Sequence, residues 1–368
     1  MMCAVVYLSA KLGQVSGKGL FQVIKDHYPR WILYPALIGV LIGHTISAGA
    51  AIGGMSAAIA VLVPVPMPLI IVPVSVAIFA LQVWGSYTLI RNIFRWLALT
   101  LLVYVAAAIL AKPDLGEVIR GTLIPTIRFN QQFLSLLVAV IGTTLSAYLY
   151  TWQSNQEVEE EIAMGRRRLE QRKGATKQEL QHTRADVVLG MFFANVVMYF
   201  IILSTASTLF KAGTHQINAA AEAAQALEPL AGGAASFLFA LGVIGVGFLA
   251  VPIMTTGAAY ALCQVVGWKH SLHAKPSEAK KFYAAIGVFT ALAMAMNFLG
   301  FNPMKALVFS GVVQGFSTPP LLLLIMLITN NRKIMGNRVN GRGLNILGWV
   351  TTAAIFAATL GLVATWFV

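Results

Sequence analysis

A run of hydroxyl side chains lies inside an otherwise apolar segment. The stretch GTTLSAYLYTWQS, residues 142–154, carries three threonines, two serines and one glutamine where a lipid-facing helix would carry leucine. Gly142 followed by Thr143, Thr144 and Ser146 marks a candidate unwound turn, which hydrocarbon tolerates only where the freed backbone is buried in protein or lines a cavity. Freed carbonyls and hydroxyls are hard oxygen ligands for a cation. The alternative is that these hydroxyls bond to carbonyls one turn earlier or to another helix.

The hydroxyl-rich stretch belongs to a strongly apolar chain. Of its 368 residues, 58% are hydrophobic and 11% charged, which is outside the range of soluble domains. Spanning helices need roughly 20 apolar residues. Nine windows near that length are free of Asp, Glu, Lys and Arg and predict an all-α polytopic membrane protein of one transmembrane domain: 32–58, 67–90, 96–111, 133–154, 187–209, 229–262, 282–301, 306–329 and 345–367. A partial helix is expected over 1–12 and a cytoplasmic helical linker over 155–185.

The net charge of +13 is explained by its distribution. All but five of the 26 Lys and Arg lie in loops that fall on one side of the membrane, which the positive-inside rule assigns to the cytoplasm. The bilayer is therefore the expected partner, and nucleic acid is not. The five basic residues on the other side are Lys112, Arg120, Arg128, Lys211 and Lys305.

Acidic side chains are absent from the predicted spans. All 13 Asp and Glu lie outside the nine windows, whereas proton-coupled carriers generally place an ionisable group at mid-membrane. His44 is the clear candidate for protonation within a span, and a histidine that hydrogen-bonds a neighbouring helix is the alternative interpretation. The convergent carboxylates or histidines of a membrane enzyme are not found. We therefore expect neither an enzyme nor a bound cofactor.

Three stretches in this order resemble the Nramp family of divalent-metal transporters, and most closely its bacterial branch that includes Nramp-related magnesium transporters. VSGKGLFQVIKDHYPRW, residues 15–31, resembles the loop between the family's second and third helices. IGTTLSAYLYTWQSNQEVEEE, residues 141–161, is similar to the sixth helix and its exit. SGVVQGFSTPPLLLLIMLITNNRKIMG, residues 310–336, resembles the tenth helix and its basic exit. The resemblance implies a multi-pass protein of the bacterial inner (plasma) membrane.

The resemblance also implies a LeuT-like inverted-repeat bundle in which broken segments of the first and sixth helices hold the ion. In the family, the first helix supplies a carboxylate from an acidic motif, DPGN in the manganese and iron carriers. Here residues 1–12 correspond to the end of the second helix, so the fold is expected to be N-terminally incomplete. Transport by the chain as given would then be impaired.

The sixth-helix motif departs from the ATVMPHN pattern of the manganese and iron carriers. Aligned from Gly142, Thr143 takes the place of the alanine whose carbonyl binds the ion, and Ser146 takes that of the methionine. A thioether selects softer transition metals, whereas a hydroxyl suits Mg²⁺ or another hard cation. Tyr148 replaces the histidine associated with proton movement, and Ala147 replaces the proline, so that no proline forces the break.

Two further positions bear on coupling and on the ion path. Ala51 and Gly54 stand where proton-coupled members place acidic residues on the third helix, which favours facilitated or potential-driven uptake. On the tenth helix, Ser317 aligns with a glutamine that can join the ion shell, and Gln314 lies about one turn earlier. The alternative for both is helix–helix hydrogen bonding.

The leading hypothesis is therefore a secondary transporter of a hard divalent cation, Mg²⁺ or Mn²⁺, without proton coupling. Its predicted metal ligands are Thr143, Thr144, Ser146 and Ser317, and its predicted substrate path is lined by Gly142, Tyr148, Gln314 and His44. Two alternatives stay open: a non-transporting membrane protein with an interaction or regulatory role, and a LeuT-fold carrier of an organic substrate. The sequence does not indicate an oligomeric state.

Overall fold

The computed structural model describes residues 1–84, 96, 99, 101–124, 126–213, 216–227, 232 and 235–366. Within these ranges the chain is helical and contains no strand. The helices are α1 (Met2–Ser16), α2 (Leu20–His27), α3 (Arg30–Leu62), α4 (Met67–Trp84), α6 (Leu102–Leu110), α7 (Leu115–Leu123), α8 (Gln131–Thr144), α9 (Ala147–Ala163), α10 (Leu169–Arg172), α11 (Lys177–Thr205), α12 (Ala220–Ala224), α14 (Ala235–Val266), α15 (Lys280–Met296), α16 (Pro303–Asn330), α17 (Arg332–Met335) and α18 (Arg342–Ala364).

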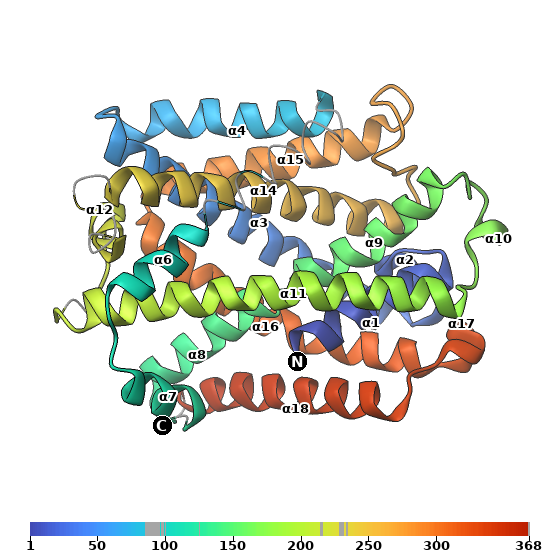
Figure 1. The fold of residues 1–368 in the computed structure, drawn as a ribbon. Coiled ribbons are helices and arrows are strands. Elements are labelled where there is room, and N and C mark those ends of the chain that lie inside the picture. Colours follow the sequence, from blue (N-terminus) through green and yellow to red (C-terminus); the bar gives the residue numbers. More distant parts are fainter. Residues whose placement is uncertain are drawn as a thin grey trace.

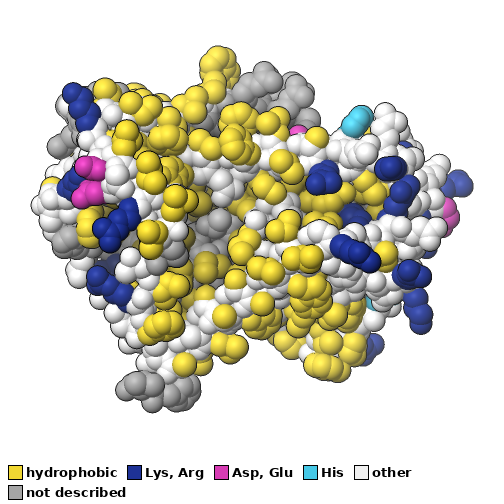
Figure 2. All heavy atoms as spheres, turned by 60° about the horizontal axis from the view of Figure 1, so that its bottom comes forward, with side chains coloured by type: hydrophobic (Ala, Val, Ile, Leu, Met, Phe, Trp, Pro, Cys, Tyr) yellow, Lys and Arg dark blue, Asp and Glu magenta, His cyan; other side chains and the backbone are white. Residues whose placement is uncertain are grey.

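The long helices run side by side as a bundle, with the short α7 and α12 at one end and α2, α10 and α17 at the other (Figure 1). We call the second end the basic end, because the described loops that are predicted to be cytoplasmic lie there. Figure 2 shows many Lys and Arg side chains at this end, beside a broad hydrophobic surface. The described part contains eight helical segments long and apolar enough to cross a membrane. The chain thus has the predicted all-α, polytopic character.

Four of the nine predicted windows fall partly outside the described residues. Residues 85–90 of window 67–90 and residue 367 of window 345–367 lie outside the description. Of window 96–111, the described residues are 96, 99 and 101–111, and α6 covers part of them. Of window 229–262, residues 229–231 and 233–234 lie outside the description, and α14 begins at Ala235. The described parts of the windows other than 96–111 coincide with a long helix or, at 133–154, with the pair α8 and α9.

Local sequence signals account for several helix ends. At the start of α11, Thr176 and Glu179 form a capping box, in which the Glu179 amide donates to the Thr176 hydroxyl at 3.1 Å and the Thr176 amide to the Glu179 carboxylate at 2.7 Å. At the start of α16, the Asn302 side chain accepts from two backbone amides, and Pro303 follows at a position where a missing N–H costs nothing. These caps fix where two of the long helices begin.

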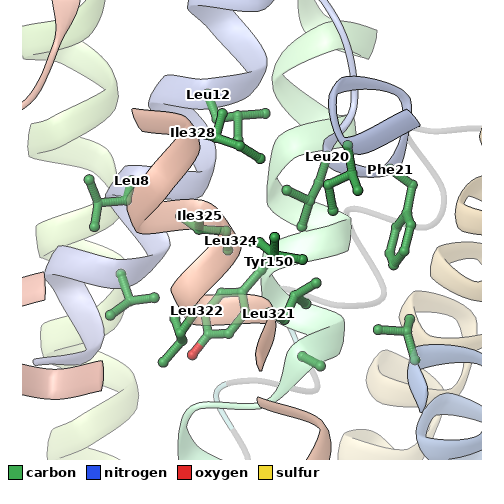
Figure 3. Close-up of a cluster of buried hydrophobic side chains, with 14 of the residues drawn as sticks. Leu8, Leu12, Leu20, Phe21, Tyr150, Leu321, Leu322, Leu324, Ile325 and Ile328 are labelled. Carbon is green, nitrogen blue, oxygen red and sulfur yellow. The ribbon is translucent and has the colours of Figure 1, made fainter. Parts of the chain in front are cut away.

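The largest buried apolar cluster joins the N-terminal helices to α9 and α16. Leu8 and Leu12 of α1 and Leu20 of α2 pack with Tyr150 of α9 and with a run of α16 residues that includes Leu321, Leu322, Leu324, Ile325 and Ile328 (Figure 3). The labelled leucines at 8, 12 and 20 are fully buried. Removing such side chains from water or lipid contact and packing them closely fixes α9 and α16 relative to each other.

Much of the predicted linker 155–185 belongs to two long helices. α9 continues to Ala163 and α11 begins at Lys177, so only a short connection with α10 lies between them. On the continued part of α9, Glu157, Glu159 and Glu161 are 6%, 5% and 4% exposed. These carboxylates lie at the basic end, beyond the predicted span, and their burial was not expected from a charged linker.

Glu159 joins α9 to the loop between α14 and α15. Its Oε1 accepts hydrogen bonds from the Tyr260 hydroxyl at 2.6 Å and from the Leu272 amide at 3.2 Å, and its Oε2 accepts from the Ser271 hydroxyl at 2.7 Å. In the same loop, burial lowers the pKa of His270, whose ring meets Tyr260 edge-on. Three hydrogen bonds to one buried side chain thus fasten α9 to this loop.

We expect the substitution Glu159→Ala to destabilise the protein by about 3 kcal/mol, because the buried Tyr260 hydroxyl and two partly buried donors lose their acceptor. Glu159→Gln keeps one carbonyl oxygen and should cost less. The measurement is thermal unfolding of the purified chain in detergent. Glu170 lies on α10 and is exposed, so Glu170→Ala is the matched control and should leave stability nearly unchanged. Equal stability of the two alanine variants would contradict the fastening role of Glu159.

Candidate functional site

The hydroxyl-rich stretch is where one membrane-crossing segment breaks into two helices. α8 ends at Thr144 and α9 begins at Ala147. Between them, Leu145 has φ −113° and ψ 43°, and Ser146 has φ −64° and ψ 141°, an extended conformation. The break therefore lies within the stretch that the sequence marks for unwinding, although no proline is present there.

Two hydroxyls compensate for the lost helical hydrogen bonds at the break. The Ser146 Oγ lies 2.5 Å from the Gly142 carbonyl and 2.9 Å from the Thr143 carbonyl. The Thr318 Oγ1 of α16 lies 3.0 Å from the Leu145 carbonyl and 2.8 Å from the Gln314 carbonyl. A hydroxyl carries a single hydrogen, so each of these two serves a pair of carbonyls. Oxygen lone pairs therefore remain at the break, where they are suited to a cation.

A close contact of glycines holds α8 against α16. A Cβ atom on Gly142 would collide with the Gly311 carbonyl oxygen and with the Gly315 nitrogen. Both colliding atoms are backbone, so no side-chain rotation relieves the clash. Glycine at 142 is thus required for the approach that brings Thr318 within reach of the Leu145 carbonyl.

Polar side chains also meet between α16 and α3. The Gln314 Nε2 donates to the Ser47 hydroxyl at 3.1 Å, while the Gln314 Oε1 is buried without a hydrogen-bond partner. The Ser317 hydroxyl lies 3.0 Å from the Val313 carbonyl of its own helix and 3.3 Å from the Gly39 carbonyl of α3. An unpaired buried amide oxygen is costly, and a cation beside it would remove that cost.

His44 of α3 lies one layer further toward the basic end of α9. Its Nε2 is 3.1 Å from the Thr151 hydroxyl, and its ring meets Tyr148 edge-on with centroids 6.2 Å apart. The approach of α14 to this pair depends on Gly257, where a Cβ would lie 3.3 Å from the His44 Nε2. His44 is fully buried. Its hydrogen bond to α9 is the kind of contact that the alternative interpretation of this histidine predicts.

The predicted site residues separate into two groups. Gly142, Ser146 and Gln314 lie where α8, α9 and α16 converge. Ser317 belongs to α16 and lies on the side of that helix that faces α3. The Thr143 and Thr144 hydroxyls instead return to carbonyls of α8, and Thr144 also contacts the Met198 sulfur of α11 at 3.5 Å. Among the described residues, no three His, Cys, Asp or Glu are grouped so as to hold a metal ion.

Sequence reasoning did not identify several atoms at the break. They are the Leu145 carbonyl, the Thr318 hydroxyl and the Tyr150 hydroxyl, which donates to the Leu145 carbonyl at 2.8 Å. Thr318 follows Gln314 by four residues and so lies on the same helix face. That spacing is the one signal by which it could have been found.

Comparison with known proteins decides the family. Residues 1–365 match the family described as Natural resistance-associated macrophage protein-like, or Nramp. The chain belongs to the Nramp family. The expected class, a divalent-metal transporter of the membrane rather than an enzyme, is thereby confirmed.

Relatives of this Nramp protein include proteins named as divalent metal cation transporters. The divalent metal cation transporter MntH of Klebsiella pneumoniae strain 342 is 26% identical over 367 residues, covering 96% of this chain and 81% of the relative. The MntH of a second Klebsiella pneumoniae strain is 27% identical over the same length. The crystal structure of the Eremococcus coleocola manganese transporter with an aromatic bis-isothiourea substituted compound has a TM-score of 0.68 at 17% identity, covering 99% of this chain and 77% of that one. This likeness confirms the expected LeuT-like fold class.

Proposed function

We propose that the chain carries a hard divalent cation, Mg²⁺ or Mn²⁺, through a site where the α8–α9 break meets α16 and α3. The observation that carries the proposal is the break itself, where the Ser146 and Thr318 hydroxyls serve four carbonyls, together with the unpaired Gln314 Oε1 between α16 and α3. Hydroxyl, amide and carbonyl oxygens are the ligands that hard cations prefer. Ser146 and Gln314 are the side chains proposed to face the ion, with Ser317 and Tyr148 lining its path.

The ion preference follows from the chemistry of these ligands. Ser146 stands where the resemblance to manganese and iron carriers would place a thioether, and a thioether favours softer metals. With oxygen alone, the ion keeps part of its water shell, as Mg²⁺ does in most proteins. The names of the relatives, a manganese transporter and divalent metal cation transporters, support a divalent cargo.

Uptake into proteoliposomes tests this preference. The full chain is reconstituted, and entry of Mg²⁺, Mn²⁺ and Cd²⁺ is followed separately with metal-sensitive dyes inside the vesicles. We expect entry of Mg²⁺ or Mn²⁺ and weak competition by Cd²⁺, because Cd²⁺ is soft and gains least from oxygen ligands. Preferred entry of Cd²⁺ would overturn the hard-ion proposal. Entry of none of the three would favour the non-transporting alternative.

We further propose that uptake is not coupled to protons. Within the described spans, the buried acidic residues are those of α9 at the basic end, far from the break along the helix. The His44 Nε2 is hydrogen-bonded to the Thr151 hydroxyl. Ala51 and Gly54, where the resemblance would place acidic residues, cannot carry a proton.

A pH-sensitive dye inside the same vesicles tests the coupling. Metal entry should leave the internal pH unchanged and should accelerate when a potassium diffusion potential makes the interior negative, because each ion carries two positive charges. The variant His44→Gln should transport within about threefold of the original chain, since glutamine can also bond Thr151. Acidification of the interior that follows metal entry and disappears in His44→Gln would show coupling through this histidine.

A further inference from the structure

A cavity of about 500 Å³ lies between α1, α11 and α18, away from the α8–α9 break. Tyr7 and Lys11 of α1 line one side, Arg184 and Val188 of α11 another, and Leu347 of α18 a third. The turn that leads into α18 completes the wall. We call this space the α11–α18 cavity. It combines three cationic side chains, those of Lys11, Arg184 and Arg342, with an apolar wall.

The cations of the α11–α18 cavity have no acidic partner. No Asp or Glu is among the residues that line it. Lys11 is only 5% exposed, and its Nζ donates to the neutral Asn340 Oδ1 at 3.0 Å. Arg184 and Arg342 make none of the ion pairs found in the described part of the chain. Lys11 is a buried charge without a counter-charge, which is unfavourable, and Arg184 and Arg342 are exposed beside it, so this cavity favours an anion.

The start of α18 adds to the positive potential. Its first residues line the cavity, its N-cap is Gly341, and no side chain caps the first turn. No acidic residue lies in that turn either. The first amides of a helix point outward unpaired, and the helix dipole places partial positive charge at the same end. An anion at this position would therefore meet backbone donors as well as Arg342.

The opposite wall is apolar and faces the membrane. Val188 and Leu347 are 44% and 50% exposed. Further exposed apolar side chains continue along both helices, among them Leu189 and Phe192 of α11 and Val350 of α18. Both α11 and α18 are among the helices able to span a membrane. The cavity thus lies where two spans leave the hydrocarbon at the basic end. Its cationic groups lie on the side of the basic end, and its apolar surface continues along the spans.

We propose that the α11–α18 cavity binds the phosphate headgroup of an anionic phospholipid, with its acyl chains against α11 and α18. Basic pockets between membrane helices on the cytoplasmic side recognise such headgroups. A free phosphate would use the same cations and amides but would gain nothing from the exposed apolar surface. This inference does not depend on which metal the protein carries.

Native mass spectrometry of the full chain in detergent tests the proposal. Phosphatidylglycerol or phosphatidylcholine is titrated in, and bound lipid is counted. The double variant R184Q/R342Q should weaken phosphatidylglycerol binding about tenfold or more and leave phosphatidylcholine binding unchanged. The double variant R184K/R342K keeps both charges and should bind as the original chain does. K275Q/K280Q is the matched control, since it also removes two exposed cations, from the loop and helix start beyond α14.

The outcomes separate the possible sources of the anion. Selective loss in R184Q/R342Q, with retention in the control, supports the site. Equal loss of binding in R184Q/R342Q and in the control K275Q/K280Q would mean that binding follows total charge. Unchanged binding in R184Q/R342Q would mean that the lipid binds elsewhere. Either result overturns the proposal. Displacement of the lipid by millimolar glycerol phosphate would also overturn it, in favour of a soluble phosphate ligand.

Discussion

Replacing Gly142 by alanine is expected to abolish metal uptake, although it adds a single methyl group. A Cβ at this position would collide with two backbone atoms of α16, the Gly311 carbonyl oxygen and the Gly315 nitrogen. The helices must then separate, because neither atom can rotate away. Overpacking of this kind costs about 1–3 kcal/mol. Separation also takes the Thr318 hydroxyl away from the Leu145 carbonyl at the break. We expect at least a tenfold fall in the uptake rate and a lower unfolding temperature.

Gly190→Ala is the matched control for this substitution. Gly190 lies within α11, and nothing comes within 4 Å of the place where its Cβ would be. In an open helix position alanine is favoured over glycine by roughly 0.5–1 kcal/mol. The same chemical change should therefore leave uptake intact and stability equal or higher. If Gly142→Ala transports as well as Gly190→Ala, the close approach of α8 to α16 is not needed for function.

The break between α8 and α9 shows how far the sequence could predict the site. Glycine followed by three hydroxyl residues within five positions indicated unwinding without a proline, and the chain unwinds at Leu145 and Ser146. Such a local signal works because Ser146 bonds carbonyls of its own chain only a few residues away. The long apolar windows were equally predictable, since hydrocarbon demands continuous helices of a set length.

Features that depend on packing between distant segments could not be predicted. The Thr318 hydroxyl completes the break from a distant segment, and only its four-residue spacing from Gln314 could have indicated it. Thr144 was predicted as a ligand from its neighbours, yet its hydroxyl is directed to α8 and α11. Glu159 resembles any exposed charge in a polar run, and only the approach of the α14–α15 loop buries it.

Hydroxyl groups that bond carbonyls do not exclude a cation site at the break. Both Ser146 and Thr318 donate their hydrogen, so their lone pairs stay available. The Gly142 and Thr143 carbonyls share the single hydrogen of the Ser146 hydroxyl, whereas the Leu145 carbonyl accepts from both Thr318 and Tyr150. An ion that arrives with part of its water shell can bind such oxygens through water or directly. The Gln314 side chain is then the most sensitive test, because its oxygen has no other partner.

Gln314→Leu is expected to lower uptake at least tenfold while the protein stays folded. Leucine fills a similar volume but removes the buried Oε1, the proposed ion ligand, together with the bond from Nε2 to Ser47. Ser47→Ala removes that bond alone and should keep most of the uptake. A tenfold effect corresponds to about 1.4 kcal/mol, which is reasonable for one oxygen ligand of a partly hydrated ion.

Gln314→Glu separates ion binding from packing at the same position. The carboxylate keeps an oxygen where Oε1 lies and adds a negative charge, so the apparent affinity for Mg²⁺ or Mn²⁺ should rise while turnover falls, because a tightly held ion leaves slowly. Uptake is measured against metal concentration for all three variants, with thermal unfolding as the test of folding. If Gln314→Leu and Ser47→Ala lose the same amount of uptake, the hydrogen bond between α3 and α16 matters and the amide oxygen is not an ion ligand. If only the Gln314 variants change, and in opposite directions for affinity, the ion passes beside this residue.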